Sequence, residues 1–118
     1  MRIILTANGD RFDGELYDHP VAEEFSQLLP LELPFEDFNA VEKVAALERE
    51  LTLRGVPSAD EPVAGELGYY APGSTLVLYY ESPGRWPGLV RLGRFDWDTA
   101  ALRGISDGTR VRIERSEV

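Results

Sequence analysis

The sequence predicts a mostly β fold, a closed barrel of six to eight strands capped by short helices. Apolar and polar residues alternate in several short segments, which is the pattern of a half-buried strand. Turn-forming pairs separate these segments at Asn8-Gly9, Pro72-Gly73 and Asp107-Gly108. Two short segments have helix-starting features, near residues 20–29 and 99–102. Many short strands with two short helices, in this order, favour a barrel with covered ends.

The first two strands are expected to form a hairpin. Apolar residues take alternate positions in residues 2–7, and the alternation resumes in residues 11–16. Asn8-Gly9 lies between the two segments, and this pair readily supplies the two positive φ angles of a type I′ turn.

A helix is predicted to follow, near residues 20–29. Pro20 suits a first helical position, and acidic residues follow in the first turn. Residues 29–35 then alternate again and predict a strand. Pro30 and Pro34 fall on the same side of it, which should be a sheet edge or a break because proline has no N–H.

The segment from Asn39 to Leu53 is ambiguous. Asn39 followed by Glu42 fits a capping box, and the apolar spacing is partly helical, so local sequence favours a helix. A strand is also possible locally, because Val44 and Ala46 could alternate with Lys43 and Ala45.

Strong β patterns return from Glu66 onward. Residues 75–80 are apolar on both faces, which predicts a central strand covered on both sides. A further strand is expected over residues 89–95, then a short helix capped by Asp96 and ended by Gly104, then a last strand over 109–115.

These residues resemble a known family. Gly65-Glu66-Leu67-Gly68-Tyr69-Tyr70-Ala71-Pro72-Gly73, with residues 76–80 and Leu92-Gly93-Arg94, is similar to the small cyclophilin-like proteins of bacteria and archaea. The resemblance covers nearly the whole chain and implies one domain over residues 1–118, a closed barrel of about eight strands. It also implies a strand over Glu42–Leu47. The Phe-His-Arg stretch of true cyclophilins is absent, so no catalytic residue is transferred.

The amino-acid composition disfavours several classes of binding partner and cofactor. The 118 residues carry a formal net charge of −9, which disfavours nucleic acid and anionic membranes. No apolar run is long enough for a membrane helix or a signal peptide, and no cysteine is present, so a cytoplasmic location is expected. His19 is the only histidine, and no metal-binding spacing or phosphate-binding loop occurs, so we expect no metal and no cofactor.

Arg91 is the residue with the clearest chemical potential. It lies inside a predicted strand with apolar neighbours on both sides, where it could donate to a carbonyl or carboxylate. We expect Asn39 or Glu42 as its partner. The predicted groove is lined by Tyr69, Tyr79 and Arg91 and bordered by those two residues, and Trp86 is a candidate contact on a loop.

Three functions are compatible with this pattern. The leading hypothesis is a non-enzymatic module that binds a peptide or a small molecule. The first alternative is a peptidyl-prolyl isomerase that uses Arg91 as the amide donor. The second is a structural or homo-oligomerisation domain that docks through Trp86 or through the proline-bearing strand.

Overall fold

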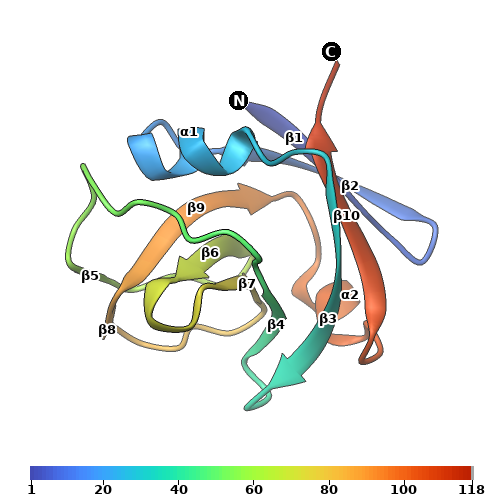
Figure 1. Ribbon diagram of the computed structural model, residues 1–118. Helices are drawn as coiled ribbons and strands as arrows, with labels where there is room; N and C mark the ends of the chain where they lie inside the picture. The colour runs from blue at the N-terminus through green and yellow to red at the C-terminus, as the bar shows by residue number, and fades with distance from the viewer. Residues whose placement is uncertain (118) are drawn as a thin grey trace.

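A computed structural model of the chain describes residues 1–117 and shows a barrel with one helix across each end (Figure 1). The strands are β1 (Arg2–Ala7), β2 (Asp10–Leu16), β3 (Leu31–Phe38), β4 (Glu42–Ala46), β5 (Ala59–Asp60), β6 (Glu66–Tyr70), β7 (Thr75–Tyr79), β8 (Trp86–Pro87), β9 (Leu89–Phe95) and β10 (Thr109–Arg115). The helices are α1 (Pro20–Ser26), the 3₁₀ turn η1 (Ala71–Gly73) and α2 (Thr99–Arg103).

Eight of these strands close the barrel in the order β1-β10-β3-β4-β7-β6-β9-β2, with all neighbours antiparallel. The predicted closed barrel of about eight strands is therefore confirmed. β5 and β8 form a separate two-stranded ribbon outside it. No helix among residues 1–117 has the length and apolar character of a membrane span.

The barrel interior and both helices share one apolar core. Val21 and Phe25 of α1 are fully buried in this core, and so is Leu102 of α2. The two helices are therefore plugs, which exclude water from the two ends of the interior. A smaller apolar cluster lies on the outer face of the barrel wall, around Val77, Tyr79 and Leu89.

Several local predictions are confirmed. Asn8 and Gly9 have φ angles of 52° and 81°, as a type I′ turn requires. α1 starts at Pro20 as predicted and ends at Ser26, earlier than expected. β7 is buried on both faces. β3 pairs with β4 only from Glu36 onward, so Pro34 lies where that side of the strand is unpaired.

Two local predictions are corrected. The helix that the capping box favoured after Asn39 does not form, because Asn39 and the residue after it have positive φ angles and turn the chain into β4. The strand implied by the family resemblance is confirmed in its place. The cap of α2 is Asp98 rather than Asp96: its side chain accepts a hydrogen bond from the backbone N–H of Ala100.

One irregularity of the barrel positions the candidate site. Between β6 and β9, Leu67 pairs with Gly93, whereas Gly68 pairs with Arg91, so β9 carries one extra residue, Leu92. This is a β-bulge, which bends a strand and redirects its side chains. The carbonyl oxygens of the bulge face the start of α1: the backbone N–H of Tyr17 donates to the Leu92 oxygen at 2.8 Å.

Candidate functional site

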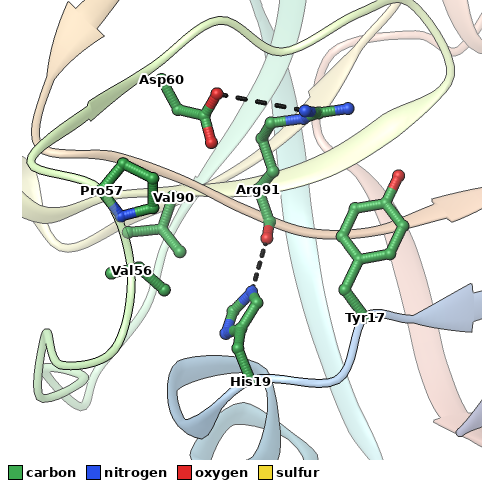
Figure 2. A pocket seen from close by; sticks show the side chains of 7 residues that line it. All are labelled: Tyr17, His19, Val56, Pro57, Asp60, Val90 and Arg91. Atoms are coloured by element: carbon green, nitrogen blue, oxygen red, sulfur yellow. Dashed lines mark hydrogen bonds and ion pairs between the residues drawn. The ribbon is translucent and has the colours of Figure 1, made fainter.

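A cavity of about 350 Å³ lies outside the barrel wall, between the start of α1, the bulged part of β9 and the segment that leads into β5. Figure 2 shows the side chains that surround it. These side chains include apolar, charged and aromatic residues. The lining residues are Tyr17, His19, Val56, Pro57, Asp60, Val90 and Arg91. A volume of this size suits a small ligand or a single peptide side chain.

Arg91 is held by a buried carboxylate. Its Nε donates to both carboxylate oxygens of Glu66, at 2.9 and 3.0 Å, and its Nη2 donates to Oε2 at 2.7 Å. The Glu66 side chain is 2% exposed, and the Arg91 side chain is 36% exposed. The pair raises the pKa of Arg91 further, chiefly through its hydrogen bonds to Glu66. The guanidinium therefore has a fixed orientation and a permanent charge.

Two further donors complete the shell around the Glu66 carboxylate. The Tyr17 hydroxyl donates to Oε2 at 2.5 Å, and the backbone N–H of Val63 donates to Oε1 at 2.7 Å. Burial, and then the hydrogen bond to Glu66, raise the pKa of Tyr17 to about 12. Tyr17 is consequently a neutral donor at physiological pH. With every acceptor direction in use, Glu66 orients its neighbours instead of facing a ligand.

His19 links the helix start to the bulge. Its Nδ1 accepts from the backbone N–H of Ala22 at 3.1 Å, which caps α1. Its Nε2 lies 2.8 Å from the carbonyl oxygen of Arg91 (Figure 2). Because a carbonyl oxygen can only accept, Nε2 must carry the proton while Nδ1 accepts. Both ring nitrogens are thus occupied by structural hydrogen bonds.

The remaining nitrogen of Arg91, Nη1, faces the cavity side. Within residues 1–117 it makes no hydrogen bond, and its ion pair with Oδ1 of Asp60 is long, at 4.0 Å. Figure 2 shows the Asp60 carboxylate beside the guanidinium, whereas His19 contacts the Arg91 carbonyl at the other end of the residue. Oδ1 of Asp60 accepts from the backbone N–H of Glu61 at 2.8 Å, and Oδ2 has no hydrogen bond within residues 1–117. The site therefore offers a free donor beside a carboxylate that can still accept. It also carries two carboxylates against one guanidinium, which disfavours a purely anionic ligand.

The structure places the predicted site residues in different surroundings. Arg91 lines the cavity, but its partner is Glu66, so the expectation that Asn39 or Glu42 would pair with it is corrected. Tyr69 faces the barrel interior and is 1% exposed, with its hydroxyl accepting from the N–H of Leu51. Asn39 is exposed in the turn before β4.

Tyr79 and Glu42 do share the outer wall with Arg91. They are directly opposed in the β4–β7 ladder, and the Tyr79 ring lies over Gly68, which is opposite Arg91. Tyr79 is 1% exposed, and its hydroxyl has no hydrogen-bond partner within the described residues. Burial, and then the Glu42 charge, raise the pKa of Tyr79. Tyr79 therefore supports the wall from beneath and does not line an open groove.

Trp86 is exposed, at 53%, on the outer ribbon. It pairs with Asp60 across the two strands, so its backbone helps to place that carboxylate. Its indole N–H donates to the carbonyl of Pro83 at 2.8 Å. Trp86 is adjacent to the cavity through Asp60 but is not part of its lining.

A second polar cluster, near α2, has a structural explanation. Lys43 is buried; its ammonium group donates to the carbonyl of Ile105 at 2.7 Å and forms an ion pair with Asp37 at 3.4 Å. The Tyr80 hydroxyl donates to the same carboxylate, which lowers the pKa of Asp37. These contacts join the segment after α2 to β3, to β4 and to the residue that follows β7, and none of the three side chains lines the cavity beside Arg91.

The sequence profile of the Cyclophilin-like family matches residues 5–114. The chain belongs to the Cyclophilin-like family. Among solved structures, the domain is similar to a hypothetical protein of Archaeoglobus fulgidus, whose solution structure superposes with a TM-score of 0.67. The two chains are 20% identical, and the alignment covers 98% of this chain and 95% of that one. This likeness shows the barrel fold only. No curated protein matches the sequence.

For this cyclophilin-like domain, the sequence alone pointed to Arg91 and missed Glu66, Tyr17 and Asp60. Glu66 carries the same signal as Arg91, because it is a charged residue beside apolar strand residues, Leu67 and Gly68. A search for buried opposite charges on predicted strands would have suggested the pair. Asp60 lies in a segment with no periodicity, and the sequence contains no signal for its position.

Proposed function

We propose that this domain is a binding module that holds a small molecule or a peptide group in the cavity beside Arg91, without catalysing a reaction on it. The observation that carries the proposal is the fixed guanidinium. A side chain clamped by three short contacts to a buried carboxylate has lost its rotamer freedom before a ligand arrives. Pre-organised donors lower the entropic cost of binding.

The surroundings of Arg91 support binding over catalysis. General acid–base catalysis needs a group that is free to exchange a proton near neutral pH. Tyr17 has a pKa of about 12, Glu66 is fully hydrogen-bonded, and both nitrogens of His19 are engaged. These groups hold the wall of the cavity in place.

Protein-observed NMR with a chemically varied fragment library tests the proposal. We expect fragments to shift the backbone signals of Val56, Asp60 and Val90, with saturation at high fragment concentration. The variant Arg91→Gln should abolish these shifts. Arg94→Gln is the matched control, because Arg94 lies on the same strand but its ion pair with Asp96 is exposed.

Loss of binding in Arg91→Gln could also result from unfolding, since Glu66 would lose its partner. The double variant Glu66→Gln/Arg91→Gln removes both charges and keeps polar side chains at both positions. The proposal fails if no fragment shifts the cavity signals of the wild type. It also fails if the folded double variant binds as the wild type does.

The rival function is prolyl isomerisation, in which the free Nη1 would donate to the substrate amide. A protease-coupled assay with Xaa-Pro peptides separates the two functions. We expect no acceleration at high protein concentration. An acceleration that Arg91→Gln abolishes, and Arg94→Gln retains, would establish the enzyme and overturn the non-catalytic proposal.

A further inference from the structure

The cavity has a donor and an acceptor at a spacing that discriminates between ligand classes. The donor is Nη1 of Arg91 and the acceptor is the carboxylate of Asp60, whose Oδ1 lies 4.0 Å from Nη1. This Oδ1 accepts one hydrogen bond from the backbone N–H of Glu61 at 2.8 Å, and a carboxylate oxygen can accept a second. This spacing is too long for a hydrogen bond between them. It leaves room for a ligand group that bonds to both. Asp60 is the less exposed of the two side chains, at 25%, so a ligand would contact both in a partly desolvated setting.

We propose that the ligand of this site is a neutral molecule with an acceptor and a donor on the same side of one polar group, namely a primary carboxamide or a hydroxyl, attached to an apolar body. The inference rests on the proposed function, because it names the ligand class of that same cavity. The ligand oxygen accepts from Nη1 of Arg91, and the ligand N–H or O–H donates to Asp60.

The spacing disfavours an ordinary trans peptide bond as the bridging group. Its C=O and N–H point in opposite directions, so partners bonded to both lie more than about 6 Å apart. In a primary carboxamide, the oxygen and one N–H point the same way and are about 2.2 Å apart, so their partners lie close together. A hydroxyl makes both bonds from one atom. Both groups match a gap of 4.0 Å.

The charges disfavour a carboxylate ligand. Asp60 would face it, and the Glu66 carboxylate behind Arg91 already offsets the guanidinium. The apolar wall of Val56, Pro57 and Val90 provides a surface for a non-polar ligand body. The pattern of few directed polar groups beside an apolar wall is usual for small-molecule sites.

NMR titrations with four one-ring probes test the inference: benzamide, benzyl alcohol, N-methylbenzamide and benzoate. They share the ring and differ in the polar group, so shape contributes little to the comparison. We expect benzamide, benzyl alcohol or both to bind in about the millimolar range, as ligands of this size commonly do. N-methylbenzamide has no N–H on the side of its carbonyl, and benzoate has no donor, so both should bind at least about tenfold more weakly.

The variant Asp60→Asn should shift the preference between two probes, benzamide and benzoate, toward benzoate. An asparagine amide can donate to a carboxylate, and the change removes one negative charge from the site. The affinity ratio of benzoate to benzamide should therefore rise by at least about tenfold relative to the wild type. Asp96→Asn is the matched control, because Asp96 pairs with exposed Arg94 outside the cavity, and it should leave the ratio unchanged.

The outcomes separate the inference from the proposed function. If benzoate or N-methylbenzamide binds the wild type as well as benzamide and benzyl alcohol do, the ligand class is wrong, while the binding module stands. An unchanged ratio in Asp60→Asn overturns the role of Asp60 in the same way. If none of the probes binds and the fragment library also leaves the cavity signals unshifted, both proposals fall.

Discussion

Removing the Arg91 guanidinium should destabilise the domain mainly by leaving the Glu66 carboxylate buried without its counter-charge. Glu66 is 2% exposed and receives three contacts of 2.7 to 3.0 Å from Arg91. Breaking a buried ion pair from one side typically costs about 3–5 kcal/mol. Arg91 is itself 36% exposed, and Glu66 keeps its bonds from Tyr17 and Val63. We therefore expect Arg91→Met to cost about 3 kcal/mol, the lower end of that range.

A double-mutant cycle measures the same effect without assuming a value for the pair. Glu66→Leu removes the buried charge and leaves Arg91 free to reach water, so it should cost less than Arg91→Met. The double variant Glu66→Leu/Arg91→Met contains neither charge. The stability that the double variant loses should be smaller than the sum of the stabilities that the two single variants lose, by at least about 1.5 kcal/mol. Urea unfolding followed by tryptophan fluorescence gives the free energies, provided that the slope with denaturant stays constant.

Arg110→Met is the matched control, because Arg110 makes a similar contact of 3.1 Å to Glu32, but both side chains are exposed, at 61% and 44%. Exposed pairs contribute about 1 kcal/mol or less. If Arg91→Met costs no more than Arg110→Met, Glu66 does not depend on the guanidinium. Additive single losses in the cycle would refute the reasoning as well.

Three further predictions concern the surroundings of the site. His19→Asn keeps a capping oxygen for α1, whereas His19→Ala removes the cap, so in thermal unfolding the alanine variant should be less stable by about 1 kcal/mol; equal stabilities would contradict the cap. Burial raises the pKa of Glu42 above 4.5, so this residue contributes to stability at low pH and the contribution is lost as the pH rises through the raised pKa. The free energy of unfolding of Glu42→Gln should therefore equal that of the wild type near pH 4 and exceed it at pH 7 by up to about 1 kcal/mol. A difference in unfolding free energy that stays constant across this pH range would be inconsistent with the raised pKa. A Cβ at Gly68 would lie 2.7 Å from the Tyr79 ring, so Gly68→Ala should cost about 1–3 kcal/mol in urea unfolding, whereas at Gly104 the added Cβ makes ordinary contacts and the same change should have little effect.

Much of the barrel was predictable because its strands are specified by local patterns. Inward positions such as Leu5 and Val111 are fully buried, and alternation alone identifies them. The turn at Asn8-Gly9 has the backbone angles that its residue types favour. In these segments the local preference and the final fold agree.

The segment after Asn39 shows where local preference is overridden. The capping box there favours a helix, but β4 pairs with both β3 and β7 and buries Lys43 against the α2 region. The contacts with β7 and with the α2 region are long-range, so the sequence of the segment does not contain them. Tertiary contacts of this kind routinely outweigh intrinsic helix propensity.

The candidate site was predictable only in part, for a related reason. Arg91 is conspicuous because it is a charged residue in an apolar strand. Its partner depends on which strands are neighbours and on their register, and Asp60 depends on the course of a segment without periodicity. The spacing of residues along the chain specifies neither the partner of Arg91 nor the position of Asp60.

The bulge at Leu92 decides on which side of the barrel wall Arg91 lies. If β6 and β9 stayed in register from Leu67 and Gly93, Arg91 would be opposite Tyr69, whose side chain faces the apolar interior. A shift of one residue moves a side chain to the other face of a sheet. With the extra residue, Arg91 is opposite Gly68 on the outer face and reaches Glu66 and the cavity, while Leu92 is fully buried in the core. The same bulge presents the Arg91 and Leu92 carbonyls to His19 and Tyr17. One inserted residue therefore gives this wall of the barrel both its charged site and its attachment to α1.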